Sequence, residues 1–171
     1  MINIRWVPGL RTDASQLPKQ ARGSSAIRAI HEENAAMSTK IFVNLPVKDL
    51  ARSTEFFTGL GFPLDERFSD ENAGCLVISD DIYAMLLTEP FFRSFTARAL
   101  PDTRKTAEAI VALEVGSRWR VDELADRAIG SGGAPAGEPM EEYGMYGRRF
   151  EDPDGHLWEV FHMDLAAVPA G

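Results

Sequence analysis

The sequence has little of what marks secreted or membrane-spanning proteins. It contains one cysteine in 171 residues, so no disulfide can form within the chain. Cys75 lies in the apolar run Cys75-Leu76-Val77-Ile78, which predicts a buried and unreactive thiol. No apolar run approaches the ~20 residues of a membrane-spanning helix, and the N-terminus lacks the apolar core of a secretory signal. We therefore expect a cytoplasmic protein.

Basic residues are also scarce. The chain has 18 Lys and Arg against 26 Asp and Glu, with a net charge of −8, and no run of Lys or Arg exceeds two residues. Nucleic acids and anionic membrane surfaces are bound by clusters of positive charge. The composition therefore predicts that neither is a partner.

Residues 1–36 lack the regular pattern of the rest. They hold two prolines and scattered charges, without a sustained apolar period. We interpret them as a disordered N-terminal extension or as the product of an upstream start codon assigned in error. Acidic residues disfavour a transit peptide. Residues 37–171 are expected to form one compact domain or two small lobes, burying roughly 70% of the unfolded surface.

Residues 40–89 predict a strand, a helix and further strands. The segment 40–47 alternates apolar and other residues, as a strand does. Asp49 is a suitable N-cap for a helix over 50–60, which Gly59 and Gly61 end. Two or three more strands are predicted, at roughly 63–68, 74–79 and 83–89, with Asp80-Asp81 forming the turn between the last two.

The same order of elements then recurs. Val111-x-Leu113-x-Val115 repeats Val43-x-Leu45-x-Val47 at an offset of 68 residues. A strand at 110–115, a helix at 118–129 capped by Ser117, and strands at 146–151 and 156–163 follow. The chain therefore reads βαβββ twice, with 90–106 as the connector, which indicates an internal duplication.

The second unit ends in "EDPDGHLWEV", residues 151–160. Asp152-Pro153-Asp154-Gly155 has the residues that a tight turn needs. The strand after it places one carboxylate, Glu159, among Leu157, Trp158, Val160 and Phe161. Glu159 can be a metal ligand, a proton-transfer group, or a residue on a solvated sheet face, and the pattern alone leaves all three open.

These segments resemble the vicinal oxygen chelate superfamily, the glyoxalase/bleomycin-resistance/dioxygenase family. The residues that carry the resemblance are "VNLPVKDLARSTEFFTGLGF" (43–62) and "YGRRFEDPDGHLWEV" (146–160). Within the superfamily, "DENAGCLVISDDIYAMLLTEPFF" (70–92) is similar to a bacterial branch labelled predicted lactoylglutathione lyase. The resemblance implies an α+β fold over 37–171, with module one at about 40–89 and module two at about 107–164. The two modules would form a curved mixed sheet, a half-open barrel with the helices outside and a ligand cleft inside.

Metal-using relatives place four ligands in that cleft. The matching positions here are Phe42, Leu86, Ile110 and Glu159, of which only Glu159 can bind a divalent ion. We therefore expect no cofactor. The alternative is a divalent metal (Zn, Ni, Mn or Fe) that takes its other ligands from Asn44, Glu114 or a partner chain.

The histidines of the chain are not expected to supply the missing metal ligands. His156 lies in the turn, His31 lies in the extension, and His162 is an odd number of residues from Glu159, so it is expected on the opposite sheet face. An apolar cleft with a few convergent polar groups is the usual form of a small-molecule site. The residues predicted to line it are Phe42, Asn44, Leu86, Thr88, Ile110, Glu114, Arg148, Glu159 and Phe161.

Two functions follow from the resemblance. The favoured one is a small-molecule-binding protein of the bleomycin-resistance type without the four-ligand metal site. The alternative is a metal-dependent enzyme, either a lactoylglutathione-lyase-like isomerase or an extradiol-type dioxygenase, with Glu159 as the catalytic candidate. Arg148-Arg149 can hold an anionic ligand or balance nearby acids. Closed two-fold symmetry is the commonest soluble assembly, and we expect a homodimer.

Overall fold

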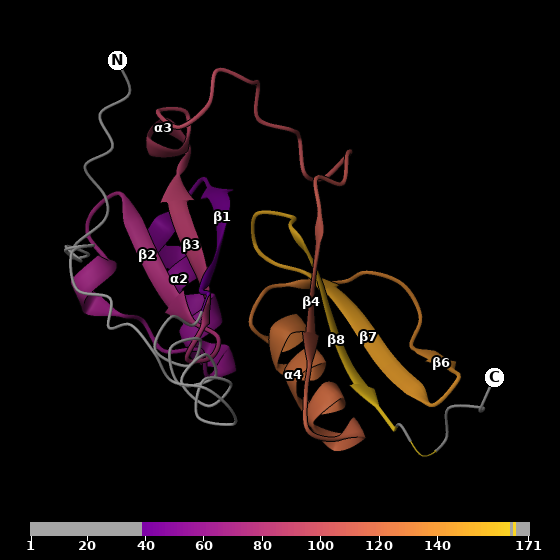
Figure 1. Ribbon diagram of the computed structural model, residues 1–171. Coiled ribbons are helices and arrows are strands. Elements are labelled where there is room, and N and C mark those ends of the chain that lie inside the picture. Colours follow the sequence, from indigo (N-terminus) through magenta and orange to yellow (C-terminus); the bar gives the residue numbers. More distant parts are fainter. Residues whose placement is uncertain (1–38, 165, 167–171) are drawn as a thin grey trace, which may run out of the picture. The chain divides into compact units, whose positions relative to one another are not determined.

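The computed structural model describes residues 39–164 and 166 (Figure 1). The extension predicted over 1–36 lies outside these residues. The described elements, in chain order, are β1 (Ile41–Val47), α2 (Leu50–Leu60), the 3-10 helix η1 (Glu66–Phe68), β2 (Ala73–Val77), β3 (Ile82–Thr88), α3 (Glu89–Phe92), β4 (Ile110–Glu114), α4 (Arg118–Gly130), β5 (Ala134–Pro135), β6 (Met140–Glu142), β7 (Met145–Glu151) and β8 (Leu157–Met163).

The strands form two sheets with matching topology. Sheet A has the order β1-β3-β2, with β1 and β3 parallel and β2 antiparallel to β3. Sheet B has the order β4-β8-β7-β5, with β4 and β8 parallel and β7 antiparallel to β8. In each sheet the first strand of the module pairs with the last, across a helix (Figure 1). The α+β fold with two modules of matching topology is confirmed, and in module one a single bridge at Leu64 stands in place of the first strand after α2.

The two long helices begin where their caps predict. The Asp49 carboxylate accepts a hydrogen bond from the Arg52 amide at 3.0 Å, and the Ser117 hydroxyl accepts one from the Arg120 amide at 3.2 Å. Gly61 ends α2 in the left-handed region at φ 100°. No helix in the described part of the chain is long and apolar enough to span a membrane.

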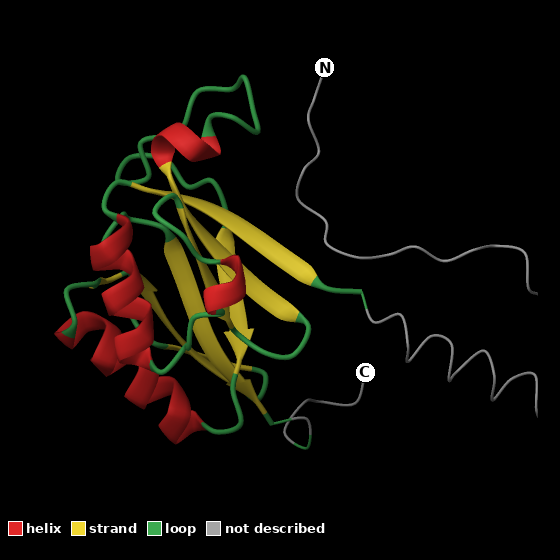
Figure 2. Ribbon diagram, turned by 90° about the vertical axis from the view of Figure 1, so that its left-hand side faces the viewer, coloured by secondary structure: helices red, strands yellow, loops and turns green. Residues whose placement is uncertain are grey.

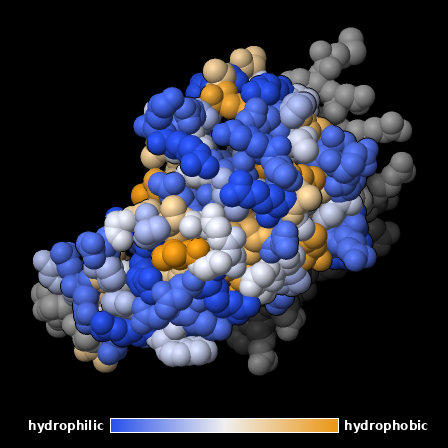
Figure 3. Space-filling model, turned by 180° about the vertical axis from the view of Figure 1, so that it is seen from behind, coloured by the Kyte–Doolittle hydropathy of each residue, from blue (hydrophilic) through white to orange (hydrophobic). Residues whose placement is uncertain are grey.

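Both helices pack on the same side of the strands, and one core joins the two modules (Figure 2). The opposite side of the two sheets is called the open face below. The helix side, seen from behind Figure 1, is largely hydrophilic, with small and separate apolar patches (Figure 3). The buried core residues come from both modules, and they are Leu45, Val47, Phe56, Phe57, Leu60, Leu76, Ala84, Leu86, Val121, Leu124, Ala125, Ala128, Phe150, Trp158 and Val160.

One predicted strand is wrong, and two short strands were missed. The segment 63–68 makes only a single bridge, from Leu64 to Leu76, and continues into η1. The Asp65 carboxylate accepts hydrogen bonds from the backbone and the side chain of Arg67, so a local cap replaces the strand ladder. In the loop after α4, β5 and β6 add to the edge of sheet B against β7.

Cys75 is fully buried in β2, as predicted. It belongs to a second apolar cluster with Ala73, Met85 and Leu87, on the open face of sheet A. Burial raises the pKa of the Cys75 thiol, which disfavours the reactive thiolate. Cys75 is therefore a packing residue.

Candidate functional site

The open face of sheet B carries most of the predicted site. The register pairs Ala112 with Glu159 and Glu114 with Phe161, so these side chains share one face with Ile110. Ala112, Glu114 and Ile110 are exposed, while Glu159 and Phe161 are half-buried. The alternation that puts Trp158 and Val160 into the core leaves this set on the other side of the sheet. The result is a surface of apolar side chains that also carries two carboxylates, those of Glu114 and Glu159.

Glu159 is held by an arginine. Its Oε2 accepts a hydrogen bond from Arg149 Nε at 2.6 Å, across the β7–β8 pair. The Glu159 side chain is 13% exposed and that of Arg149 is 43% exposed, so the pair sits partly within the sheet surface with the arginine outermost. The contact uses Nε, and the described residues show no hydrogen bond from the two terminal nitrogens of Arg149. Such a guanidinium can receive an anionic or carbonyl group of a ligand.

Arg148 does not line the open face, which corrects the prediction. It pairs with Val160 in the register and therefore faces the helix side. There its Nη1 contacts Asp126 at 2.8 Å and Asp122 at 3.3 Å, both on α4. Neighbouring residues of a strand point to opposite faces, so an error of one position exchanged Arg148 for Arg149. Counting outward from a turn at 152–155 would pair residue 149 with residue 158, so only the observed register places Arg149 opposite Glu159.

Leu86 and Thr88 are also on the helix side. Leu86 is fully buried in the core shared by both modules, and Thr88 pairs with core residue Val47. The open face of β3 instead carries Tyr83, Met85 and Leu87. The run from Ala84 to Leu87 is apolar at every position, so alternation of polarity could not assign its faces.

The open face of sheet A is partly filled. Met85 and Leu87 are buried beneath three aromatic side chains. Phe68 belongs to η1, and Phe91 and Phe92 belong to α3 (Glu89–Phe92), directly after β3. Toward the start of β1 this face is exposed again, and two aromatic rings stack on each other there.

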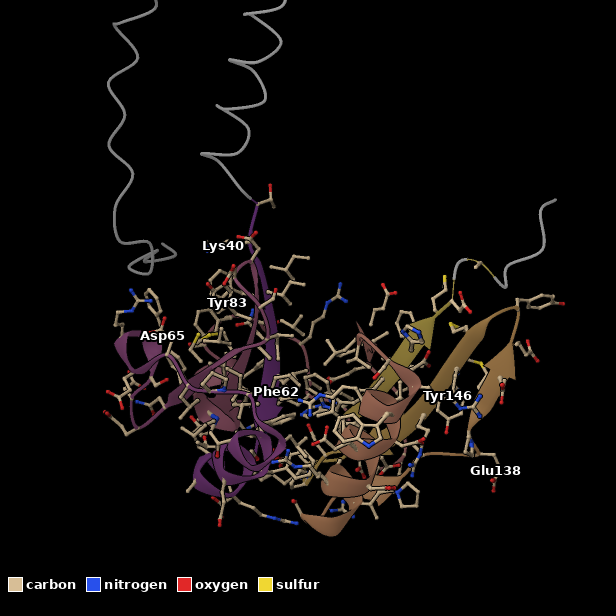
Figure 4. All side chains as sticks on the ribbon, turned by 90° about the horizontal axis from the view of Figure 1, so that it is seen from below. Lys40, Phe62, Asp65, Tyr83, Glu138 and Tyr146 are labelled. Atoms are coloured by element: carbon tan, nitrogen blue, oxygen red, sulfur yellow. The ribbon has the colours of Figure 1, made fainter. Side chains whose placement is uncertain are left out.

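Phe42, as predicted, lies on this open part. Its ring stacks on Tyr83 with the centroids 4.7 Å apart and an interplanar angle of 10°. Lys40 donates to the Tyr83 hydroxyl at 3.2 Å, and Figure 4 shows these two side chains together. This hydrogen bond chiefly raises the pKa of the Lys40 ammonium above its ordinary value. Asn44, the next outward residue of β1, is exposed and donates weakly to the Phe42 carbonyl at 3.4 Å.

The residues do not fit a four-ligand metal site. Phe42 and Ile110 offer no nitrogen, oxygen or sulfur ligand, and neither Leu86 nor its open-face neighbour Leu87 does. Within residues 39–164 and 166, no group of three or more His, Cys, Asp and Glu side chains comes together in a way that could hold an ion. The one remaining ligand, Glu159, is bound to Arg149.

The two described histidines are engaged elsewhere. His156 Nε2 lies 2.8 Å from the Pro46 carbonyl oxygen, and His162 Nδ1 lies 3.0 Å from the Val115 carbonyl oxygen. His162 pairs with Tyr146 on the helix side of sheet B, as its odd spacing from Glu159 predicted.

A groove of about 470 Å³ lies near the β6–β7 turn, away from the predicted site residues. Its lining includes Arg118, Glu141, Tyr146 and His162. Arg118 makes two hydrogen bonds to Glu141, at 2.6 and 2.9 Å, and lies over the Tyr146 ring at 3.9 Å. Tyr146 donates to Asp122 at 2.7 Å. These polar groups satisfy one another, so they hold the start of α4 against sheet B.

Two modules of matching topology share a core, with the helices on one side and the polar pair Arg149–Glu159 on the other, and this arrangement defines a paired-module α+β class of protein. The chain belongs to the Glyoxalase/Bleomycin resistance protein/Dioxygenase superfamily, whose family model matches residues 41–160. A comparison with curated proteins finds no match.

Solved structures share the fold. The hypothetical protein SA1046 from S. aureus is 27% identical, with 74% of this chain and 94% of that chain covered and a TM-score of 0.63. Fosfomycin resistance protein FosX from Mesorhizobium loti is 16% identical, with 76% of this chain and 96% of that chain covered and a TM-score of 0.55. The antibiotic binding protein TnmS3 from Streptomyces sp. CB03234 is 19% identical, with 75% of this chain and 98% of that chain covered and a TM-score of 0.55.

Proposed function

We propose that this protein binds a small molecule on the open face without a metal ion, and that Arg149 and Glu159 anchor the ligand. One observation carries the proposal: the only residue at a family ligand position able to hold a metal, Glu159, is in a 2.6 Å ion pair with Arg149. A cation at Glu159 would have to displace this guanidinium and find further ligands where the chain has Phe42 and Ile110.

The chemistry of the face suggests the kind of ligand. Apolar side chains surround the ion pair, among them Ile110, Leu157 and Phe161. A ligand with a flat or apolar body and one anionic or carbonyl group would place the body on these side chains and the polar group on Arg149. Two structural neighbours, an antibiotic binding protein and a fosfomycin resistance protein, support small-molecule binding as a function that this fold performs.

The ligand hypothesis is tested by thermal shift. The panel contains hemithioacetals of glutathione, catechols and glycopeptide antibiotics, each with and without divalent metal salts. We expect at least one organic probe to stabilise the protein without metal, by about 2.7 kcal/mol at 100 times its Kd. Arg149→Met keeps the apolar stem and removes the charge, so it should abolish this shift. Arg148→Met, on the opposite face, is the matched control and should preserve it.

Elemental analysis completes the test. Protein purified without added metal should contain well below one Zn, Ni, Mn or Fe ion per chain. About one tightly bound ion per chain, lost on Glu159→Gln, would contradict the proposal, as would metal-dependent turnover of a hemithioacetal. Either result would make the isomerase or dioxygenase alternative the better description.

We also propose that two copies of the chain form a homodimer. The outer strands β1 and β4 each pair with one other strand among the described residues, and they carry Ile41 and Ile110, which are 53% and 51% exposed. Exposed apolar side chains on outer strands are typical of surfaces that another chain covers. Light scattering at micromolar concentration should give the mass of two chains, and the mass of one chain would refute the dimer.

A further inference from the structure

The internal duplication allows the open faces of the two sheets to be compared position by position. The repeat has an offset of 68 residues, so Phe42 of β1 corresponds to Ile110 of β4. In sheet A Phe42 pairs with Tyr83, and in sheet B Ile110 pairs with Leu157. The same place on the open face therefore holds two aromatic rings in module one and two aliphatic side chains in module two.

The fold does not require aromatic rings at this place. Ile110 and Leu157 complete the equivalent strand pair in sheet B, and the two sheets have matching topology. Phe42 is 41% exposed, so its ring lies outside the buried core and presents aromatic surface to solvent. The aromatic pair is a feature of module one alone, beyond what the strand pairing needs.

Tyr83 is held in a fixed orientation beside Phe42. Its hydroxyl donates to the Asp80 carbonyl at 2.9 Å and accepts from Lys40 Nζ at 3.2 Å. Lys40 Nζ also donates to the same Asp80 carbonyl at 2.8 Å. Phe42 stacks on this ring with an interplanar angle of 10°. Because the Tyr83 hydroxyl is bonded as donor and as acceptor, the ring pair is organised before a ligand arrives, which lowers the cost of binding.

The two open faces also differ in charge, two residues further along each strand. Asn44 pairs with Met85 in sheet A, whereas the equivalent residue of sheet B, Ala112, pairs with Glu159. Met85 therefore takes the place in module one that Glu159 has in module two. The Arg149–Glu159 ion pair has no counterpart at this place in sheet A. The open face thus combines an aromatic surface from module one with a charged group from module two.

We propose that the ligand of the open face is an aromatic carboxylate, whose ring stacks on Phe42 and whose carboxylate binds Arg149. This inference rests on the small-molecule binding proposed above and names the class of ligand. A third ring extends the Phe42–Tyr83 pair in the stacked geometry that aromatic rings favour when they are offset. The fold places the carboxylate and the ring on different modules, so the ligand bridges them.

Arg149 is suited to a second carboxylate. Its terminal nitrogens donate no hydrogen bond among the described residues, and a guanidinium has five N–H donors. The Arg149 side chain is 43% exposed against 13% for Glu159, so the guanidinium lies between solvent and the Glu159 carboxylate. A ligand carboxylate reaches the cation first, and charge-assisted hydrogen bonds hold it there.

Isothermal titration calorimetry with two matched probes tests the class of ligand on the full chain. Biphenyl-4-carboxylate and bicyclohexyl-4-carboxylate have the same carbon skeleton and charge, and only the first is aromatic. The saturated probe exposes at least as much apolar surface, so the hydrophobic effect gives the aromatic probe no advantage. We expect the Kd of the aromatic probe to be about 2- to 10-fold lower, the range for one aromatic pair. Its ring should also shift the Phe42 ring-proton NMR signals upfield.

Four variants locate the preference. Phe42→Leu keeps an apolar side chain without a ring, so the two probes should bind equally, whereas Phe42→Tyr keeps a ring and should keep the preference. Trp119→Leu is the control, because it removes a 69% exposed ring from α4 on the helix side and should leave the preference unchanged. Arg149→Met should weaken the binding of both probes and preserve the ratio of their Kd values.

The outcomes separate this inference from the proposed function. Equal binding of the two probes to wild type, weakened for both by Arg149→Met, would support the proposed function and overturn the aromatic class of ligand. A preference that persists in Phe42→Leu would overturn the stacking on Phe42. Binding of neither probe would also overturn this inference, while the proposed function is tested by its own ligand panel.

Discussion

Replacing Trp158 with alanine is expected to lower the free energy of unfolding by about 4 kcal/mol, within the range for truncating a buried tryptophan. Trp158 is 1% exposed and lies where the two modules meet. Its ring centroid is 4.9 Å from that of Phe57 on α2, and it is stacked on Phe150 of β7 at 6.5 Å. The substitution removes contacts to both modules and leaves a cavity that the surrounding strands cannot close.

A polar contact adds to this cost. Trp158 Nε1 donates to Asp152 Oδ2 at 3.1 Å, inside the buried turn. Burial raises the pKa of the Asp152 carboxyl above its usual range, and the nearby His156 and these hydrogen bonds oppose the rise. Trp158→Phe keeps one aromatic ring and removes this donor together with part of the indole. It should cost about 1–3 kcal/mol, the penalty for one unsatisfied buried group plus a small volume loss.

Urea denaturation of wild type and variants measures these differences. Trp119→Ala is the control, because Trp119 is 69% exposed and should change stability by less than about 0.5 kcal/mol. Since one core spans both modules, Trp158→Ala should shift a single cooperative transition rather than split it. Equal effects at positions 119 and 158, or a transition that separates into two, would contradict the shared core.

Much of the fold could be predicted because local signals agreed with one another. Asp49 and Ser117 begin helices, Gly61 ends one, and the repeated V-x-L-x-V marks the first strand of each module. The segment 63–68 failed for a physical reason: Asp65 satisfies nearby backbone groups by itself, and no alternation of side chains can report that competition.

The sheet face of a predicted residue was right where its strand neighbours are clearly core residues. Phe42, Asn44, Ile110, Glu114 and Phe161 lie on the open face because their neighbours are core residues. Where both faces are alike, the assignment failed. Leu86 and Thr88 come from a strand that is apolar on each side, and Arg148 is followed by a second arginine. Choosing between such neighbours requires the pairing register, which is a property of the folded sheet.

The acidic residue in the apolar strand β8 now has a physical explanation. Glu159 does not stand alone on the sheet, because Arg149 lies directly opposite on β7 and neutralises it. The turn that precedes it sets this pairing, so the Asp-Pro-Asp-Gly sequence positions the ion pair as well as joining the strands. The two aspartates of this turn stabilise the fold, and substitution of the second one, Asp154, tests that role.

Asp154→Ala is expected to lower the free energy of unfolding by about 3 kcal/mol, the sum of one amide left without an acceptor and one hydrogen bond to a charged group lost, at about 1–3 kcal/mol each. The Asp154 carboxylate is buried and belongs to module two. It accepts a hydrogen bond from the Lys48 amide in module one. The Ser53 hydroxyl, also buried, donates to the second oxygen at 2.6 Å. Without the carboxylate, the Lys48 N–H loses its acceptor, and the Ser53 O–H keeps only the weaker contact with the Asp49 carbonyl at 3.0 Å.

Asparagine and a double-mutant cycle resolve the two contacts. Asp154→Asn keeps an oxygen for the Lys48 amide and presents an NH₂ that the Ser53 hydroxyl can accept from, so the expected cost is about 1 kcal/mol. Ser53→Ala alone should cost about 1 kcal/mol or more, and in the Asp154→Ala background it should cost little, giving a coupling energy of about 1 kcal/mol or more. Urea unfolding of the four proteins of the cycle measures this coupling. If the two substitutions were additive, the carboxylate would not be joining the modules through Ser53, and among the described contacts only the Lys48 amide would tie it to module one.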